Sequence, residues 1–321
     1  MTGAARLRTI DRHDSEDGMA AIGFIGASGL MGHGMAKNLL AKGHALTFKA
    51  HRNRARLADL LAAGATEART SAEVARNADI VFICVGSSPQ IEDIVWGADG
   101  IATAARPGLM VVDTSTAEPS STARIRDSLA AQGTRFVDAP LARTPKEAEE
   151  GRLNIMVGAD PADFDMLKPV LQAFCENIFH VGPPGSGHVL KLVNNMLAMT
   201  MAASIAEAAA VAAKNGLPLA KLYDVVTAGG VNSGIFQMMF GQMLLGNLAG
   251  LRFAIANGQK DLRYYTHLAE ASAVPSFLGE AAHQSFVQAA NLGHGDKFIA
   301  SLFEAQEQTA KVRIVDSRRQ P

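Results

Sequence analysis

The sequence predicts an α/β fold: a Rossmann-like, doubly wound parallel sheet, followed by an all-α domain that a long helix joins to it. Three observations lead to this prediction. Short apolar runs alternate with helical patterns over about the first 180 residues, as in a parallel sheet covered by helices. A glycine- and proline-rich cluster then interrupts the chain at 182–187. Almost every segment beyond it is rich in alanine, leucine and methionine, which favour helices.

The predicted elements of the first domain follow in order along the chain. An apolar run at 21–25 ends in glycine and predicts a buried strand. A glycine-rich turn at 26–32 leads into a helix at 35–42, and a second helix is expected at 54–63. Further strands are expected at 45–49, 80–85, 110–113, 135–138 and 153–158. Strands separated by helices predict a parallel arrangement.

The chain divides into three predicted regions. Residues 1–18 are polar and mixed in charge without an apolar stretch, so we expect a disordered N-terminal extension and no secretory signal. Residues 19–182 form the predicted sheet domain. Residues 183–321 form the predicted all-helical domain, whose first helix is expected at 188–214.

The composition excludes several classes of binding partner. The 321 residues are 48% hydrophobic and 19% charged, and their formal net charge of −1 gives no basic field for nucleic acid or an anionic membrane. No uninterrupted apolar run reaches the roughly 18 residues that a membrane span needs. The two cysteines have no metal-ligand spacing and fit a reducing compartment. We therefore expect a cytoplasmic enzyme with no metal, no nucleic acid partner and no membrane partner.

The glycine-rich turn predicts a dinucleotide site. Glycines allow a tight turn and a close approach of the backbone to a pyrophosphate, and the following helix offers free N–H groups. The spacing is Gly-x-x-Gly-x-x-Gly, one residue longer than the usual Gly-x-Gly-x-x-Gly. The alternative is a glycine-rich turn that binds no ligand. The expected cofactor contacts here are Gly26, Ser28, Gly29, Leu30, Met31 and Gly32.

A basic segment follows the second predicted strand. NAD sites usually place an acid here to bind the ribose 2′-hydroxyl, whereas arginine accommodates a 2′-phosphate. No acid occurs before Asp59, and Arg52 and Arg54 are available. We expect His51 and Arg52 to contact a cofactor that is NADP(H) by preference, with NAD(H) as the alternative. A solvated basic loop is the other interpretation.

A lysine and an amide lie four residues apart in the helix after the breaker cluster. Residues at i and i+4 are neighbours on a helix surface, so Lys191 and Asn195 can converge on one small ligand. Leu190, Leu192 and Val193 flank the lysine, and a loss of hydration lowers the pKa of an ammonium. Such a lysine suits a proton donor near neutral pH. The alternative is a lysine whose stem packs on an ordinary helix.

Several motifs occur in one order along nearly the whole chain: Gly23-Phe-Ile-Gly, Leu30-Met-Gly, Met35-Ala-Lys-Asn-Leu, Val112-Asp-Thr-Ser-Thr, Phe136-Val-Asp-Ala-Pro, Gly185-x-Gly-x-x-x-Lys-x-x-Asn-Asn and Lys260-Asp-Leu. In this combination the chain resembles the β-hydroxyacid dehydrogenase family, which includes 3-hydroxyisobutyrate dehydrogenase and tartronate semialdehyde reductase. The resemblance implies an NAD(P)-binding domain and a helical domain that shapes the substrate cleft. It also implies a homodimer or homotetramer built through the helical domain.

The resemblance also implies roles for single residues. Lys191 matches the family's catalytic lysine, which would protonate the aldehyde oxygen as hydride arrives, and Asn195 matches an amide that orients the substrate. Thr116 and Lys260 match positions near the cofactor; alone, they would suggest a turn-capping hydroxyl and a solvated helix charge. The loop that matches the family's cofactor-covering segment is Val85, Gly86 and Ser87. The expected substrate contacts are Ser115, Ala142, Arg143, Thr144 and Asn195.

One loop departs from the family pattern. The family has Val-Ser-Gly-Gly where this chain has Leu-Ala-Arg-Thr at 141–144, so Ala142 lacks the serine hydroxyl and an arginine follows it. The loop is similar to that of 3-sulfolactaldehyde reductase within the same family. An arginine fork binds a sulfonate, phosphonate or carboxylate through two parallel hydrogen bonds. We interpret Arg143 and Thr144 as an anion clamp; the alternative is that Arg143 points to solvent or pairs with Glu147.

The expected function is an NADP-preferring, reversible reduction of a short acid-bearing aldehyde to its β-hydroxyacid, of the tartronate semialdehyde or 3-hydroxyisobutyrate type. An organosulfonate aldehyde is the alternative substrate. Imine reduction on a similar scaffold is disfavoured because Lys191 is present. A non-catalytic dehydrogenase-like interaction module is the remote alternative. It is disfavoured because the chain keeps Lys191 and Asn195 and has no basic run at 1–18.

Overall fold

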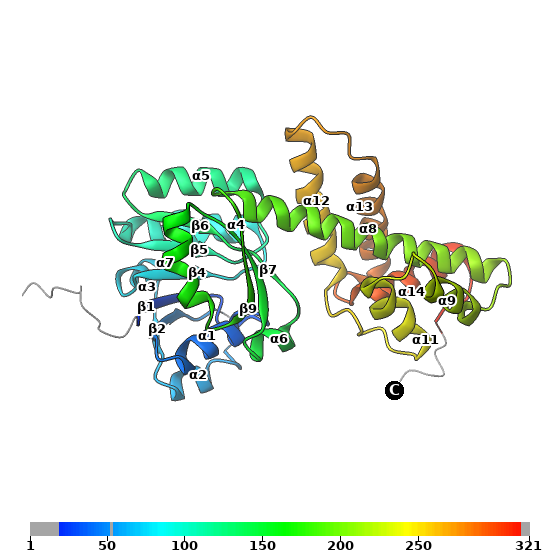
Figure 1. The fold of residues 1–321 in the computed structure, drawn as a ribbon, viewed down its shortest axis with the longest axis horizontal. Coiled ribbons are helices and arrows are strands. Elements are labelled where there is room, and N and C mark those ends of the chain that lie inside the picture. The colour runs from blue at the N-terminus through cyan, green and yellow to red at the C-terminus, as the bar shows by residue number, and fades with distance from the viewer. Residues whose placement is uncertain (1–18, 52–53, 316–321) are drawn as a thin grey trace, which may run out of the picture.

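The structure is a computed structural model that describes residues 19–51 and 54–315. The predicted N-terminal extension at 1–18 and the predicted cofactor contact Arg52 lie outside the described residues. Figure 1 shows a sheet domain and a helical domain, with α8 (Ser186–Lys214) leaving the first and running through the second. The predicted fold class, a Rossmann-like domain followed by a helical domain, is confirmed.

Nine strands of the described chain form one sheet in the order β3-β2-β1-β4-β5-β6-β8-β7, with β9 paired to β8. All pairs from β3 to β6 are parallel. Strands β4 and β5 at its centre are buried on both faces, as expected where helices cover both sides. The strands are β1 (Ala21–Ile25), β2 (Ala45–Lys49), β3 (Thr66–Ala68), β4 (Ile80–Ile83), β5 (Met110–Asp113), β6 (Arg135–Asp138), β7 (Leu141–Ala142), β8 (Leu153–Gly158) and β9 (Cys175–Gly182).

The sheet differs from the prediction at one end. Strand β8 pairs antiparallel with β6 and with β7, and parallel with β9, so the sheet is mixed there. Strands β3, β7 and β9 were not expected from the sequence. Two of them have only two or three residues, and β9 is half-exposed, so none shows a long apolar run.

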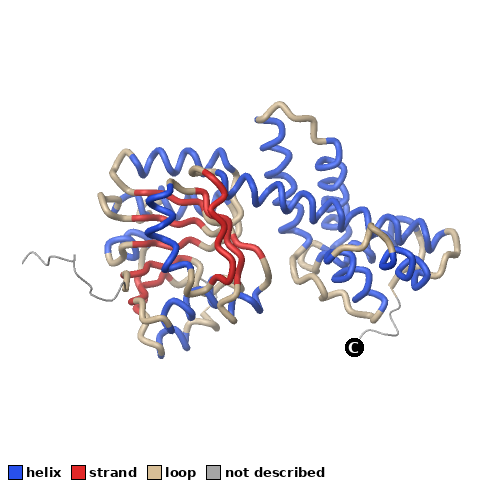
Figure 2. Tube along the Cα trace, viewed as in Figure 1, coloured by secondary structure: helices blue, strands red, loops and turns tan. Residues whose placement is uncertain are grey.

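Alternating residues of the central strands supply two cores, one on each face of the sheet. In β4, Ile80 and Phe82 pack in one core, whereas Val81 and Ile83 pack in the other. The helices that cover the sheet are shown in Figure 2. They are α1 (Gly32–Ala41), α2 (Ala58–Ala62), α3 (Ser71–Arg76), α4 (Ser88–Trp96), α5 (Pro119–Ala130), α6 (Pro145–Glu149) and α7 (Pro161–Leu171).

The helical domain is built around α8, which packs against α12, α13 and α14. Helix α8 is also long and apolar enough to cross a membrane. This is weak evidence for a membrane span, because the core helix of a soluble protein meets the same criteria. The helical domain has its own hydrophobic core, the third of the molecule, which contains Met199, Phe240 and Phe286. The remaining helices are α9 (Leu219–Ala228), α10 (Gly234–Phe236), α11 (Gln242–Leu244), α12 (Ile255–Ala271), α13 (Phe277–Ala289) and α14 (Leu302–Ala310).

Candidate active site

The carboxyl ends of the parallel strands bring the predicted cofactor segments to one edge of the sheet. The chain continues from β1 into Gly26, from β4 into the 85–88 loop, and from β5 into Ser115 and Thr116. Strands β1 and β4 are neighbours, and β2 and β5 lie on their outer sides. Their junction is the switch point where doubly wound sheets bind ligands.

The glycine turn needs its glycines at the observed positions. Gly26 has φ +104°, and a Cβ on it would lie 2.1 Å from the Cys84 carbonyl oxygen. A Cβ on Gly32 would lie 2.3 Å from the Gly26 carbonyl oxygen. That same oxygen accepts a hydrogen bond from the Gly29 N–H at 2.9 Å. The residue added relative to the usual spacing is therefore accommodated within a β-turn.

The first turn of α1 fits a phosphate group. It has no side-chain cap and no acidic residue. The His33 N–H donates to the Gly29 carbonyl at 3.1 Å, and the N–H groups of Gly32 and Gly34 are the ones that could meet an anion. Ser28, Leu30 and Met31 complete the turn, and Leu30 is exposed. The backbone therefore offers the cradle that a dinucleotide pyrophosphate requires.

The loop after β4 is held in place by side chains of both domains. The Val85 N–H donates to Ser115 Oγ at 3.0 Å, and the Gly86 N–H donates to Gln90 Oε1 at 2.8 Å. The Ser88 N–H donates to the Tyr264 hydroxyl of α12 at 3.2 Å. Ser115 is buried, so this predicted substrate contact positions the cofactor loop in the structure.

The basic segment after β2 is only partly available to a ligand. His51 is exposed. Arg54 instead pairs with Glu67 through two hydrogen bonds of 2.8 and 2.6 Å. Its guanidinium is therefore not free for a cofactor phosphate, although the sequence had suggested that it would be. The first acid beyond the segment, Asp59, lies 3.0 Å from the His33 ring.

The helix that carries Lys191 begins on a buried carboxylate. Asp138, at the end of β6, accepts the N–H of Gly185 at 2.6 Å and the N–H of His188 at 2.8 Å. Burial raises the pKa of Asp138 more than these two donors lower it. A Cβ on Gly187 would lie 2.6 Å from the Asp138 carbonyl oxygen. The Gly-x-Gly sequence therefore lets α8 start directly against the sheet.

A second buried pair lies beside this junction. His188 has no exposed surface, and its Nδ1 lies 2.6 Å from the Thr122 hydroxyl. Its Nε2 lies 3.6 Å from Asp113 Oδ2, without a hydrogen bond. Burial raises the pKa of Asp113 to about 6, against the lowering by Ser115 and Lys260. Burial likewise lowers the pKa of His188, so both groups are pushed toward their neutral forms.

Asn195 and Lys260 meet at one carboxylate. Asn195 Nδ2 donates to Asp261 Oδ2 at 2.6 Å, and Lys260 Nζ lies 2.7 Å from Asp261 Oδ1. Lys260 Nζ also donates to the Thr116 carbonyl at 3.3 Å and lies 4.8 Å from the centroid of the Tyr264 ring. Helices α8 and α12 are thereby tied to the loop after β5. The predicted residues Asn195, Lys260 and Thr116 are brought together.

Lys191 lies one helical turn before Asn195. Burial lowers the pKa of its ammonium, while Asp261 raises it and Lys260 lowers it further. The prediction that three flanking apolar residues shield Lys191 from water was wrong in part. Leu192 is fully buried, but Leu190 and Val193 are 39% and 40% exposed. Successive residues point about 100° apart around a helix, so flanking residues do not enclose a side chain. The two charges that act on the Lys191 ammonium, Asp261 and Lys260, belong to α12, which packs against α8.

The predicted anion clamp is engaged with protein groups. Arg143 has φ +79°, unusual for a residue with a side chain. Its guanidinium forms an ion pair with Glu176 and donates to the Arg152 carbonyl at 2.5 Å. Thr144 caps α6 in a reciprocal capping box with Glu147, and Ala142 pairs with Asn154 in the sheet. The geometry matches the alternative in which Arg143 pairs with an acid, although that acid is Glu176.

Sequence reasoning missed four residues of the site: Asp138, His188, Asp261 and Tyr264. Asp261 had a signal, because it stands in the Lys260-Asp-Leu motif. Asp138 similarly stands in the Phe136-Val-Asp-Ala-Pro motif. No local sequence pattern pointed to His188 or Tyr264, because their partners, Thr122 and Ser88, lie 66 and 176 residues away in the sequence.

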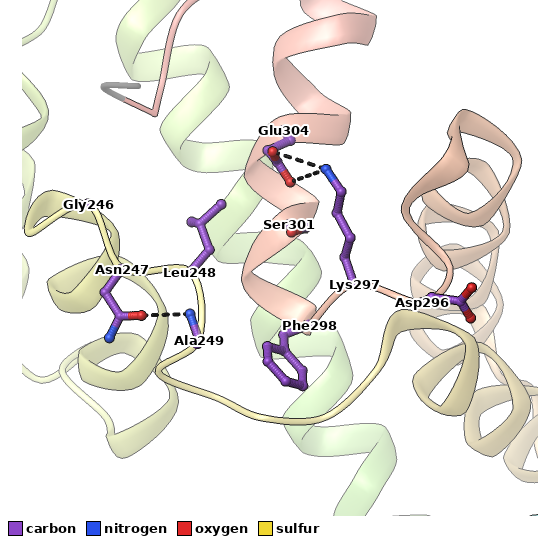
Figure 3. Close-up of a pocket in the computed structure, with 9 residues that line it drawn as sticks. All are labelled: Gly246, Asn247, Leu248, Ala249, Asp296, Lys297, Phe298, Ser301 and Glu304. Atoms are coloured by element: carbon purple, nitrogen blue, oxygen red, sulfur yellow. Dashed lines mark hydrogen bonds and ion pairs between the residues drawn. The ribbon is translucent and has the colours of Figure 1, made fainter. Parts of the chain in front are cut away.

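A separate hollow of about 470 Å³ lies in the helical domain and contains none of the predicted site residues. Figure 3 shows Lys297 and Glu304 of its lining facing one another, with Lys297 Nζ 3.1 Å from Glu304 Oε2, whereas Asp296 lies apart from this pair. In the described part of the chain, no group of three or more His, Cys, Asp or Glu side chains could hold a metal ion.

Fold and site together define a two-domain, nicotinamide-dependent dehydrogenase. Residues 21–182 match the family model described as the NAD binding domain of 6-phosphogluconate dehydrogenase. Residues 185–304 match the model described as NAD-binding of NADP-dependent 3-hydroxyisobutyrate dehydrogenase. The chain belongs to the β-hydroxyacid dehydrogenase family, and it is an NAD(P)-dependent enzyme of the hydroxyacid dehydrogenase and semialdehyde reductase type.

Individual relatives match almost end to end. The chain is 33% identical over 297 residues to 2-(hydroxymethyl)glutarate dehydrogenase of Eubacterium barkeri, covering 91% of this chain and 97% of the relative. It is 29% identical to 3-sulfolactaldehyde reductase of Escherichia coli, covering 92% of this chain and 100% of that one. A crystal structure of 3-hydroxyisobutyrate dehydrogenase from Salmonella typhimurium superimposes with a TM-score of 0.76 at 31% identity, covering 88% and 99%.

Proposed function

We propose that this protein is an NADP-preferring reductase of a short, acid-bearing aldehyde, with Lys191 as the general acid and, in reverse, the general base. One observation carries the proposal. An ammonium whose pKa is lowered by burial lies one turn from an amide, and that amide is fixed to the cofactor-side loops through Asp261.

The residues have separable tasks in this reaction. The bound nicotinamide supplies the hydride. Lys191 gives a proton to the aldehyde oxygen, and its lowered pKa brings proton transfer closer to neutral pH. An amide NH₂ has two donors, so Asn195 keeps one N–H for a substrate oxygen while Asp261 binds the other. Tyr264 and Ser115 hold the loop at 85–88 against the cofactor side of the sheet.

The preference for NADP is proposed from charge. Asp59, the first acid after β2, is paired with His33, and the segment before it is basic. A 2′-phosphate is therefore favoured over a ribose hydroxyl at this position. Initial rates with NADPH and NADH test this directly. We expect a higher kcat/KM with NADPH, and Arg52→Glu should reduce that preference.

The substrate is proposed to be a small anion of the tartronate semialdehyde or 3-hydroxyisobutyrate type. The relatives named 2-(hydroxymethyl)glutarate dehydrogenase and 3-sulfolactaldehyde reductase support an acid-bearing substrate. A sulfonate substrate is the alternative, and it would require Arg143 to exchange Glu176 for the ligand. Arg143→Ala separates the two. An increased KM for the sulfonate aldehyde supports this exchange, and unchanged KM values for both anions exclude the clamp.

A panel of semialdehydes and β-hydroxyacids with both cofactors tests the proposed function as a whole. We expect saturable oxidation of NADPH with at least one carboxylate- or sulfonate-bearing aldehyde, and weaker activity with the matching neutral aldehyde. Cofactor binding without turnover of any member of the panel would contradict the proposal.

We also propose a homodimer or homotetramer, acting in the cytoplasm, where Cys84 and Cys175 stay free thiols as in the structure. The exposed apolar residues Leu190, Val193, Leu197 and Met201 form one stripe along α8. Stripes of this kind mark contact surfaces. Light scattering should give a mass of two or four chains, and Leu197→Glu should lower it. A monomer at micromolar concentration would exclude this assembly.

A further inference from the structure

His33 has a carboxylate at each ring nitrogen. Its Nδ1 lies 2.6 Å from Glu149 Oε1, and its Nε2 lies 3.0 Å from Asp59 Oδ2. A neutral imidazole has one N–H and one lone pair, and a lone pair that faces a carboxylate is repulsive. Only the imidazolium donates to both partners. The His33 side chain is 10% exposed, whereas the side chains of Asp59 and Glu149 are 56% and 32% exposed.

This cation lies where three functional segments meet. His33 belongs to the first turn of α1, directly after Gly32 of the glycine turn. Asp59 is in α2, just beyond the basic segment that follows β2. Glu149 is in α6, which begins immediately after the substrate loop at 142–144. One protonated ring therefore joins the proposed pyrophosphate, ribose and substrate regions.

Helix α1 also contacts the backbone of α6 directly. A Cβ on Gly34 would lie 2.4 Å from the Ala148 carbonyl carbon, so the two helices approach closely. Asn38 Nδ2 donates to the carbonyls of Ala148 and Glu149 at 3.0 and 3.3 Å. A movement of either helix is therefore transmitted to the other.

The two acids at the ring are held in their charged forms. The charged groups that face it are Glu149 from α6 and Asp59 from α2, and Lys37 of α1 lies 3.3 Å from Glu149. Burial alone would raise the pKa of both acids. Hydrogen bonds and charge from His33 outweigh burial, with help from Lys37 at Glu149, and the pKa of each acid lies below its usual range.

We propose that His33 is a positioning residue that couples cofactor binding to the substrate loop through the contact between α1 and α6. A dinucleotide at the glycine turn fixes the first turn of α1, and the two contacts of the ring extend that order to α6 and to residues 142–144. The substrate half of this inference rests on the proposed function, whereas the cofactor half requires only that a dinucleotide binds.

The test compares His33→Gln with Lys37→Ala. Lys37 is exposed and reaches the same Glu149 without contacting Asp59, so it is the matched control. Hydrogen exchange of the 141–150 peptide is measured with and without NADPH at pH 6. We expect NADPH to slow exchange about tenfold in the wild type. This protection should be absent in His33→Gln and retained in Lys37→Ala.

The same cofactor-induced protection in His33→Gln and wild type would overturn the proposal. Glu149→Gln provides a second variant should His33→Gln not fold. It should show less protection than the wild type, because the contact between His33 and α6 loses its charged acceptor. With an active substrate, His33→Gln should raise the aldehyde KM more than it lowers kcat. The exchange experiment needs no turnover, so it stays decisive even if the aldehyde panel fails.

Discussion

Asp261 is the residue on which the proposed catalytic group depends most. It is buried, it fixes the Asn195 amide, and it pairs with Lys260. It also raises the pKa of Lys191 against the lowering by burial and Lys260. A single carboxylate thus sets both the geometry and the proton affinity of the site.

Asp261→Asn keeps the shape and removes the charge. We expect kcat/KM to fall roughly 10- to 100-fold, because a hydrogen bond to a charged group is lost. A general acid must be protonated, so aldehyde reduction declines as pH rises through the pKa of Lys191. Without Asp261 that pKa is lower, and the decline should move to lower pH. The pH profile of kcat/KM measures this shift.

Asp224→Asn is the control, since Asp224 is an exposed acid paired only with Lys221 among the described contacts. Its pH profile should match that of the wild type. An unmoved decline in Asp261→Asn would show that Asp261 does not act on the proton donor.

At the scale of residues, local spacing predicted local geometry and nothing more. The i,i+4 rule placed Lys191 and Asn195 on one helix face. The same rule could not show that Asp261 would meet Asn195 from another helix, 66 residues away. Nor could it reveal that Glu176 would take the Arg143 guanidinium. Partners of charged side chains are set by the packing of distant elements.

Among the elements, the glycine turn makes the firmest prediction. In an open helix position Gly→Ala is favourable, but a Cβ on Gly32 would lie 2.3 Å from the Gly26 carbonyl oxygen. We expect Gly32→Ala to lose roughly 1–3 kcal/mol of stability through overpacking, and to weaken NADPH binding. Thermal unfolding and fluorescence titration measure the two effects.

Gly234→Ala is the matched control, because no atom lies within 4 Å of the added Cβ and α10 is far from the sheet in the chain. It should keep the stability and the cofactor affinity of the wild type. Equal NADPH affinity in Gly32→Ala and Gly234→Ala would contradict a tight turn as the phosphate site.

Elements with strong apolar runs were predicted, and those without them were not. Strands β1, β2, β5, β6 and β8 have the expected bounds. Strand β9 was missed because half-exposed polar residues interrupt its apolar pattern. The antiparallel direction of β8 was also missed. The direction of a strand depends on how the chain returns to the sheet, and the residues of the strand itself do not indicate it.

For the molecule as a whole, Asp113 links folding to pH. Its pKa is about 6 in the fold, above the value of 3.8 for an ordinary aspartate. The folded state therefore binds the proton more tightly than the unfolded state, and the stabilising contribution is lost as pH rises from about 4 to about 6. A shift of this size corresponds to about 3 kcal/mol.

Asp113→Asn cannot ionise but can still accept the hydrogen bond from the Ser115 N–H. Its free energy of unfolding, relative to that of the wild type, should therefore increase between pH 4 and pH 6 and then stay level. Urea unfolding at several pH values gives this difference. A difference independent of pH would mean that Asp113 does not titrate in this range.

The two domains meet along one face of α12. Lys260, Tyr264 and His267 follow the i, i+4, i+7 spacing of a single helix face, and they contact Thr116, Ser88 and Glu118 of the sheet domain. This face sets where Asp261 lies, and Asp261 in turn acts on Lys191. The position of Lys191, the proposed proton donor, relative to the glycine turn thus depends on how the two domains are assembled.

Turnover by Lys191→Ala, with NADPH affinity determined on the same sample, tests the central claim most directly. We expect kcat for aldehyde reduction to fall roughly 10³-fold, as for loss of a general acid, while the dissociation constant for NADPH stays within about twofold, since Lys191 lies outside the glycine turn. Turnover within about tenfold of the wild type at unchanged NADPH affinity would contradict the assignment of the proton donor.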